Sequence, residues 1–295
     1  MPVVASLVMD SLRSVQQWPV DTVAVAVVDA SGVVVPSGVV VHSHGPQDRP
    51  FRLASVTKLL SAYAVLLAVQ EGALDWHQPA GPPGATVRHL LAHASGLAFD
   101  DTRAVVAPEA KRIYSNTGFV MLADAVAAGS GIPFADYLAE GVFQPLGMAS
   151  SRLAGCAAAG AVSTCADLAR FAAELQAPTL LAPQILAEAT QVAYPGLDGV
   201  VPGYGMQRPN DWGLGFELRD HKSPHWTGSR NSPTTFGHFG QSGTFLWVDP
   251  AAGAACIALT DRDFGPWARD AWPLFSDGVL AELAGEYRSG PPQID

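Results

Sequence analysis

The sequence predicts an α+β fold in which an antiparallel sheet takes strands from both chain ends, is flanked by helices and is interrupted by an inserted, mostly helical region. Two observations support this prediction. β-Branched, strand-like runs occur before residue 53 and strands return after Trp212, whereas the stretch from about 73 to 200 consists of Ala-rich helical segments separated by Pro and Gly. Because each layer must bury its apolar face against another layer, this order of elements favours one sheet with a helical insertion.

The N-terminal part begins with a short amphipathic helix, predicted over residues 5–16. The sequence continues with TVAVAVVDASGVVVPSGVVV, two β-branched runs that predict a hairpin with its turn at Asp29–Gly32. A helix follows in which the residues from Leu59 to Val69 are nearly all apolar, which is typical of a helix buried on most sides.

The helical region is predicted from four segments that combine apolar periodicity with Pro or Gly nearby: TVRHLLAHASG, TGFVMLADAVAAGSG, PFADYLAEGVFQPLG and CADLARFAAELQ. Strands return in GLGFELR, GTFLWVDP and AACIALTDR, and an amphipathic stretch from Trp267 to Leu283 follows them. We therefore predict one domain over residues 1–295, with an α/β part formed by 1–72 plus 212–295 and a helical part formed by 73–211.

Composition and charge exclude several classes of protein. The chain has 295 residues, is 48% apolar and carries a formal net charge of -10 without a Lys/Arg cluster, so neither nucleic acid nor an anionic membrane is an expected partner. No apolar run reaches the roughly 18 residues of a membrane span. The first residues lack a signal-peptide pattern, which predicts a cytoplasmic location. Cys156, Cys165 and Cys256 have no metal-type spacing, and we expect each to be a small buried apolar residue.

Lys58 is the first residue that the predicted fold does not explain. It falls in the first turn of the apolar helix, where burial penalises a charge and the helix dipole disfavours a cation. Ser55 lies three residues earlier, so the two side chains share a helix face about 5–6 Å apart. A partly desolvated amine beside a hydroxyl is a base beside a nucleophile, and a free backbone N–H at Ser55 suits an oxyanion. The alternative is that Ser55 caps the helix and Lys58 extends to water.

Tyr114-Ser115-Asn116 stands just before another apolar helical segment. A loop at that place can present a phenol and an amide to a cleft. Tyr114, sharing a proton with Lys58, would relay protons to Ser55 or to a leaving group, and Asn116 would donate to a substrate carbonyl. The alternative is an exposed tyrosine followed by an asparagine helix cap.

His238-Phe239-Gly240 enters a strand in GHFGQSGTFLWVDP. Glycine here allows another backbone to approach closely, and an extended substrate can pair with the strand. The N–H of Gln241 is a candidate second oxyanion donor, and His238 is a titratable group at the strand start. The alternative is an ordinary histidine at a strand edge.

In this order, the Ser-x-x-Lys, Tyr-x-Asn and His-x-Gly motifs resemble those of the serine β-lactamase and penicillin-binding-protein superfamily, and most closely its class C-like branch of esterases, D-amino-acid peptidases and DD-peptidases. Four further segments look like family segments outside the active site: TVRHLLAHASGL, GVFQPLGM, AGAVSTCADLARFAAEL and WGLGFEL. The resemblance covers most of the chain. It implies the fold predicted above, with the active site in a groove between the two parts.

The sequence departs from the family pattern in two places. The stretch after Gly72 is compressed, which predicts a trimmed helical region and a more open cleft. His238 replaces a lysine, so the fixed positive charge for a substrate carboxylate is weakened; Arg230 either supplies that charge or is a surface-loop arginine. His93 and Ser95 look like a Ser-His pair, and we interpret them as structural.

The resemblance implies a serine hydrolase that acts on an ester or amide carbonyl through an acyl-enzyme on Ser55. The implied roles are proton transfer by Lys58 and Tyr114, oxyanion binding by the N–H groups of Ser55 and Gln241, and substrate positioning by Asn116, His238 and Gly240. No metal and no cofactor are expected, the substrate is a small ester, amide or lactam, and the oligomeric state is not predicted. The alternatives are a DD-peptidase or true β-lactamase, and a non-catalytic binding protein on the same fold.

Overall fold

A six-stranded antiparallel sheet is the centre of the fold in the computed structural model, which describes residues 9–29 and 41–285. Its strands are β1 (Val23–Asp29), β2 (Val41–His44), β8 (Glu217–Leu218), β9 (Phe236–Gly240), β10 (Thr244–Asp249) and β11 (Ala254–Thr260). The spatial order is β2-β1-β11-β10-β9-β8. The N-terminal strand β1 pairs with the C-terminal strand β11, with Val25 opposite Ala258. The prediction of one sheet built from both chain ends is therefore confirmed.

The two faces of the sheet bury different cores, because successive side chains of a strand point to opposite faces. In β1, Ala24 and Ala26 belong to one core and Val25 and Val27 to the other. In β9, Phe239 points into the second core. The neighbouring side chain of β9, that of residue 238, is therefore directed to the opposite face.

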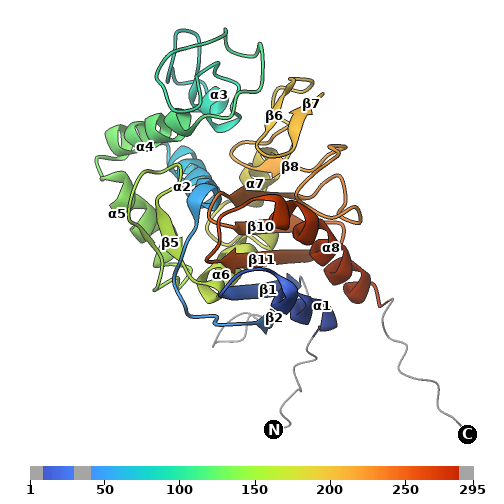
Figure 1. Ribbon diagram of the computed structural model, residues 1–295. Helices are drawn as coiled ribbons and strands as arrows, with labels where there is room; N and C mark the ends of the chain where they lie inside the picture. Colours follow the sequence, from blue (N-terminus) through green and yellow to red (C-terminus); the bar gives the residue numbers. More distant parts are fainter. Residues whose placement is uncertain (1–8, 30–40, 286–295) are drawn as a thin grey trace, which may run out of the picture.

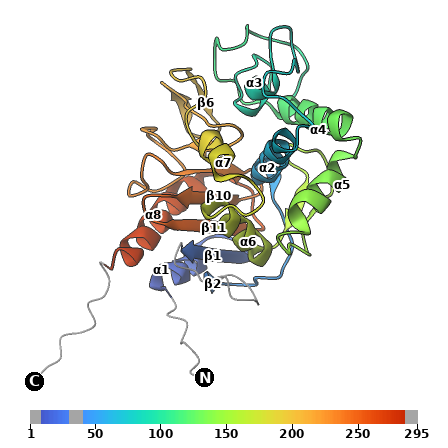
Figure 2. The same cartoon turned by 180° about the vertical axis from the view of Figure 1, so that it is seen from behind.

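The helices are α1 (Asp10–Arg13), α2 (Thr57–Gln70), α3 (Val87–Leu91), α4 (Asn116–Ser130), α5 (Phe134–Leu138), α6 (Cys165–Gln176), α7 (Pro183–Ala189) and α8 (Pro266–Leu283). Figure 1 shows α1 and α8 in front of the sheet, and α3, α4 and α5 gathered to one side with α2 between them and the sheet. Figure 2 shows α6 and α7 on the opposite face. The sheet is thus covered by helices on both faces, as predicted.

Short strands connect the helical region to the sheet. β3 (Phe51–Arg52), β5 (Ala161–Ser163) and β4 (Arg152–Leu153) form one small sheet, and β6 (Gly199–Val201) and β7 (Gly205–Gln207) form a two-stranded ribbon. A 3-10 turn over Ala54–Val56 leads from β3 into α2, and a π-helical turn over Ala139–Phe143 extends α5.

Several predicted elements differ in extent from the observed ones. The turn at Asp29–Gly32 falls mostly outside the described residues, although β1 and β2 do pair antiparallel. The predicted helix over 5–16 is observed as α1 followed by a 3-10 turn over Ser14–Gln17, and residues 1–8 lie outside the described part. The strand predicted in GLGFELR is reduced to the two residues of β8, because Gly215 has a φ of +90°, which lies outside the β region.

The division into an α/β part and a helical part remains a prediction. Helix α6 lies within the segment 73–211 but packs on β1 and β11.

No single helix of the described residues is long and apolar enough to cross a membrane; only α4 together with Phe134–Phe143, two segments bent by 86° from one another, meets the criteria of length and composition.

Candidate active site

The start of α2 brings Ser55 and Lys58 to one place, as their spacing predicts. Ser55 lies in the 3-10 turn before the helix, and Lys58 is in the first turn of α2 with its side chain fully buried. Ala54 has a φ of 44°, a left-handed conformation that is costly for a residue with a Cβ. A strained residue directly before Ser55 is typical of functional turns, because packing around it must hold the conformation.

The Lys58 amine has three oxygen atoms around it. Nζ lies 2.6 Å from Asn116 Oδ1, 2.9 Å from the Ala158 carbonyl oxygen and 3.5 Å from Ser55 Oγ. The first two oxygens can only accept, so they receive two N–H bonds of a neutral amine. The lone pair of that neutral amine would then face the Ser55 hydroxyl. The distance of 3.5 Å between Nζ and Oγ has to shorten for proton transfer.

Burial decides the protonation of Lys58. Desolvation lowers the pKa of the amine to about 7, although the Cys156 thiol and the Asp100 carboxylate act in the opposite direction. The amine therefore loses its proton near neutral pH, where an ordinary lysine would stay charged. This is the property that a general base requires.

Asn116 is the first residue of α4 and is held on both sides. Its Oδ1 accepts from Lys58, and its Nδ2 donates to Asp100 Oδ1 at 2.8 Å. The helix cap is Ser115, whose hydroxyl accepts from the Gly118 N–H at 3.1 Å. The side chain of Asn116 therefore orients the amine of Lys58, and its predicted contact with a substrate carbonyl remains a prediction.

Tyr114 is enclosed by aromatic rings. Its ring centroid lies 4.7 Å from that of His93, 5.7 Å from Phe99, 5.8 Å from Trp212 and 5.5 Å from His238. The Lys58 Nζ sits 4.6 Å from its ring centroid.

The Tyr114 hydroxyl stays protonated in this enclosure. It makes no well-formed hydrogen bond to a described residue, yet the Ser55 side chain is near enough to lower its pKa slightly. Burial is the larger effect and raises the pKa well above the ordinary range. The phenol is therefore a proton donor held beside Ser55 and Lys58.

His238 is neutral. It is 3% exposed, and its Nδ1 donates to the Phe239 carbonyl oxygen at 2.7 Å, which leaves Nε2 as an unprotonated acceptor. Burial and the charge of Lys58 lower its pKa to about 3. The third motif therefore contributes no positive charge near pH 7. Arg230 is exposed, and its backbone N–H donates to Asp277 of α8 at 2.7 Å.

Glycine at position 240 lets the end of β9 approach the turn that holds Ser55. A Cβ on Gly240 would lie 2.3 Å from the Leu53 carbonyl oxygen and 3.2 Å from the Cβ of Ala54. Thr244 Oγ1 also donates to the Leu53 carbonyl at 2.9 Å. Among the described residues, the backbone N–H groups of Ser55 and Gln241 have no hydrogen-bond acceptor. Two free donors at adjoining chain segments fit the predicted oxyanion site.

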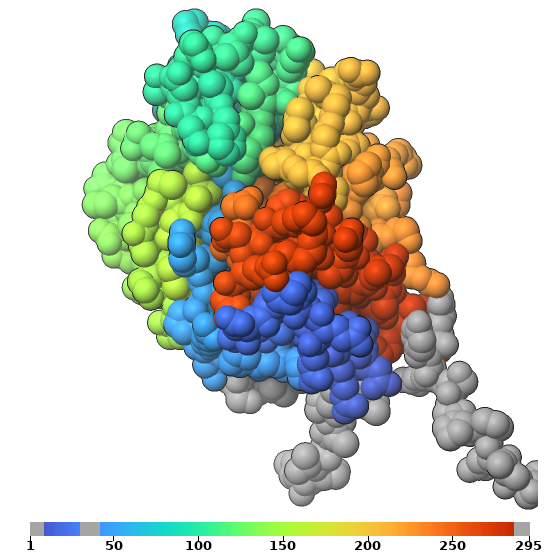
Figure 3. All heavy atoms as spheres, viewed as in Figure 1, coloured from blue at the N-terminus to red at the C-terminus, as the bar shows by residue number. Residues whose placement is uncertain are grey.

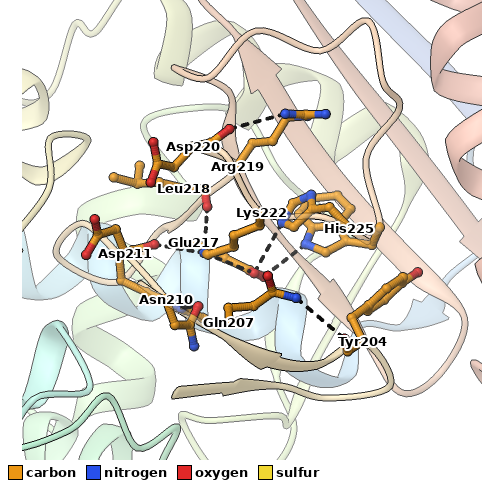
Figure 4. Close-up of polar contacts among 12 residues, drawn as sticks. Tyr204, Gln207, Asn210, Asp211, Glu217, Leu218, Arg219, Asp220, Lys222 and His225 are labelled. Carbon is orange, nitrogen blue, oxygen red and sulfur yellow. Dashed lines mark hydrogen bonds and ion pairs between the residues drawn. The ribbon is translucent and has the colours of Figure 1, made fainter. Parts of the chain in front are cut away.

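A buried polar network surrounds Glu217 (Figure 4), which lies opposite Gly237, the residue before the third motif. Glu217 of β8 lies 3.4 Å from Lys222 Nζ and 3.3 Å from His225 Nε2, and it accepts from Trp226 Nε1 at 2.9 Å. The Lys222 amine also donates to the carbonyl oxygens of Asp211 and Leu218. Burial alone raises the pKa of Glu217, but Lys222 and His225 outweigh it and hold the pKa well below its usual range. The carboxylate is therefore ionised and paired.

The sequence missed several groups of this site. The Ala158 carbonyl and Asp100 come from loops, and no residue pattern points to a backbone carbonyl. Trp212 was expected outside the site as part of a family segment, and that is wrong, because it contacts Tyr114. The Nδ1 of His93 accepts from the Ser115 N–H at 3.2 Å and its ring packs on Tyr114, so it too lies beside the site, and its structural role stays a prediction.

The prediction for the cysteines is correct for two of the three. Cys165 and Cys256 are buried, but Cys156 is exposed. It lies near enough to Lys58 to counteract part of the effect by which burial lowers the pKa of the Lys58 amine. Cys156 is the last exposed residue before the chain enters the interior at residues 157 and 158. Within residues 9–29 and 41–285, no three His, Cys, Asp or Glu side chains are grouped so as to hold a metal ion.

The fold agrees with the comparisons with known proteins. A family model described as Beta-lactamase matches residues 15–277, so the chain belongs to the beta-lactamase family. The crystal structure of a beta-lactamase from Mycobacterium bovis, Mb2281c, is 55% identical, covers 92% of this chain and 99% of its own, and superposes with a TM-score of 0.89.

More distant relatives share parts of the chain or only the fold. A penicillin-binding protein of Bacillus subtilis is 30% identical over 136 residues, which are 35% of this chain and 30% of that protein. The D-alanyl-D-alanine-carboxypeptidase/endopeptidase AmpH of Escherichia coli is 27% identical over 138 residues, 34% of this chain and 36% of its own. The chain thus spans about a third of these curated relatives. Simvastatin synthase (LovD) of Aspergillus terreus, 18% identical with a TM-score of 0.77, covers 94% of this chain and 97% of its own and shares the fold.

We expect Lys58→Met and Lys58→Arg both to lose ester hydrolysis by several orders of magnitude, because neither side chain can act as a base near pH 7. In the wild type, kcat/KM should rise with pH through about 7, as Lys58 loses its proton. The folded pKa is below the unfolded one, so wild-type stability should rise between about pH 7 and 10 relative to Lys58→Met. Rate–pH profiles and melting curves measure both effects, and an active Lys58→Arg protein would exclude Lys58 as the base.

We expect Glu217→Gln to lower the free energy of unfolding by about 3–5 kcal/mol, because it leaves the buried Lys222 ammonium unpaired. Lys222→Met should act similarly, and the double variant should lose less than the sum of the two. Since the folded pKa of Glu217 is depressed, the difference between wild type and Glu217→Gln should shrink as pH falls below about 4. Urea titrations of the four proteins test this; additive losses would contradict the pairing.

Proposed function

We propose that the protein is a serine hydrolase that cleaves a small ester or amide through an acyl-enzyme on Ser55. The observation that carries the proposal is the position of the buried Lys58 amine, whose Nζ lies 2.6 Å from Asn116 Oδ1, 2.9 Å from the Ala158 carbonyl oxygen and 3.5 Å from Ser55 Oγ. A buried apolar residue at this position would stabilise the fold better than a buried lysine does. A base beside a nucleophile explains it.

In the proposed mechanism, Ser55 Oγ attacks the substrate carbonyl while Lys58 takes the hydroxyl proton. The oxyanion receives hydrogen bonds from the N–H groups of Ser55 and Gln241, each worth roughly 3–4 kcal/mol in the transition state. Tyr114 then gives its phenolic proton to the leaving group and regains a proton from the Lys58 ammonium. Water hydrolyses the ester by the reverse sequence of proton transfers.

We propose that an ester without a negative charge beside His238 is a better substrate than a penicillin. The family likeness leaves β-lactams and D-amino-acid peptides as candidates, since AmpH is named for the latter activity. However, the third motif of this chain holds a neutral histidine in place of a lysine, so it offers no fixed charge to a substrate carboxylate. The non-catalytic alternative would not require the set of Ser55, Lys58 and Tyr114.

We expect Ser55→Ala to abolish hydrolysis of p-nitrophenyl acetate and to fold normally. The loss of one hydroxyl at the helix start should cost no more than about 0.5–2 kcal/mol of stability. Intact-protein mass spectrometry after incubation with an activated ester, a fluorophosphonate and a β-lactam should show one covalent adduct on the wild type, acyl or phosphonyl according to the reagent, and none on the variant. Retention of most activity by Ser55→Ala would disprove the mechanism.

We expect short p-nitrophenyl esters such as the acetate and butyrate to be better substrates than the β-lactam nitrocefin. The physical reason is the missing positive charge at His238. Steady-state kinetics with the three compounds, measured on the same preparation, gives the ranking. A larger kcat/KM for nitrocefin would reverse the assignment and favour the β-lactamase alternative.

A further inference from the structure

A cavity of about 350 Å³ is lined by Tyr114 and the rest of the segment 111–114 on one side and by the β6–β7 ribbon on the other. This volume lies at the lower end of the range of small-molecule sites. The two walls are tied together, since Arg112 and Gly199 form a parallel bridge and a Cβ on Gly199 would lie 2.4 Å from the Arg112 carbonyl oxygen. On the face in Figure 3, the teal segment that includes α3 and the yellow segment that carries β6 and β7 stand on either side of a hollow.

The walls of this cavity are unusually apolar for exposed surface. Phe99 is 49% exposed, Val200 49% and Met206 54%, and all three line the cavity. They are three of the seven large apolar side chains that are exposed in the described part of the chain. Scattered exposed apolar residues need no explanation, but a group of them beside a candidate catalytic residue does. A bound apolar group would remove this surface from water.

The rim of the cavity is cationic in an acidic protein. Lys111 is exposed there and forms no ion pair with a described residue, and Arg208 pairs with Asp198 at 3.4 Å. The Arg112 guanidinium, in contrast, is buried and donates to four carbonyl oxygens, so it is part of the wall's structure. Lys111 is thus the unneutralised charge, although the chain as a whole carries -10. An anionic group at the far end of a ligand would fit it.

The position of Tyr114 decides which half of a substrate reaches this cavity. The inference rests on the proposed function, in which Tyr114 protonates the leaving oxygen. That atom must lie within hydrogen-bond reach of the phenol, so the group attached to it continues past Tyr114. The acyl half lies on the other side of the carbonyl.

We propose that the cavity between Tyr114, Phe99 and the β6–β7 ribbon is a leaving-group subsite for a linear apolar alcohol that carries a carboxylate at its far end, bound by Lys111. In the step concerned, the bond from Ser55 Oγ to the carbonyl carbon forms and the bond from that carbon to the alcohol oxygen breaks. The proton of Ser55 passes to Lys58, and the proton of Tyr114 passes to the departing alcohol. Water then releases the acyl group as an acid.

Acetate esters of different alcohols test this subsite directly in the wild-type protein. We expect kcat/KM to rise by about twofold per methylene from methyl to hexyl acetate, since a methylene half buried gains part of its full transfer energy. 6-Acetoxyhexanoate should exceed the neutral 6-acetoxyhexanamide by about threefold to tenfold at low salt, and this advantage should fall at high salt. Because every ester gives the same acetyl-enzyme, the deacylation rate constant should be identical for all of them.

Variants of the walls and the rim identify the residues involved. Met206→Gln should reduce the ratio of kcat/KM between hexyl and methyl acetate by about threefold, and Lys111→Gln should remove the preference for the carboxylate. The matched controls are Leu274→Gln, an apolar side chain 74% exposed on α8, and Arg152→Gln, an exposed cation on β4. Neither control residue lines the cavity, so both ratios should stay at their wild-type values.

The outcomes separate the inference from the proposed function. Mass spectrometry first establishes whether p-nitrophenyl acetate acetylates Ser55. An acetylated Ser55 combined with equal kcat/KM for methyl and hexyl acetate would overturn the subsite and leave the hydrolase proposal intact. The subsite would also be overturned, with the hydrolase proposal intact, if the ratio of kcat/KM between hexyl and methyl acetate were equal in Met206→Gln and Leu274→Gln. Absence of ester hydrolysis together with absence of any covalent adduct on Ser55 would overturn the proposed function, and the subsite with it.

Discussion

The fold is organised around one demand, that a lysine amine be buried without losing its hydrogen bonds. An ammonium group taken out of water is costly, and the cost falls when the group is neutral and its N–H bonds are satisfied. Asn116 and the Ala158 carbonyl supply those acceptors from two different segments. Helix α2 must therefore be covered by α4 and by the 155–160 loop at the same time, and the Ser55 hydroxyl remains as the partner of the lone pair.

Some groups of the candidate site are brought together by local helix geometry, which the sequence predicts. Others are brought together by long-range packing, which the sequence does not predict. Ser55 and Lys58 are three residues apart on a helix, so their proximity follows from helix geometry. The strands at both chain ends were recognisable because β-branched and aromatic runs carry their own signal. The Ala158 carbonyl, Asp100 and the exposure of Cys156 depend on loop paths, for which no periodicity exists.

The aromatic enclosure of Tyr114 shows how polar chemistry and apolar packing share residues at this site. The same rings that exclude water from the phenol keep its proton in place, and Trp212 links them to the strand-rich part of the chain. Next to Trp212, the paired Glu217 and Lys222 place a fixed charge pair behind His238. Neutral histidines and a protonated phenol are therefore consequences of one desolvated environment rather than of separate tuning at each residue.

The pairing of β1 with β11 also has a consequence for how the chain reaches its native state. Val23 lies opposite Thr260 in the register of the sheet, so this contact closes a loop of most of the chain. Closing long loops before their contacts form is slow, and proteins of this size commonly populate intermediates. During synthesis, β1 must wait for β11 to leave the ribosome. The edge of β1 that faces β11 therefore stays unpaired until nearly the whole chain has been made, although its other edge can pair with β2 early.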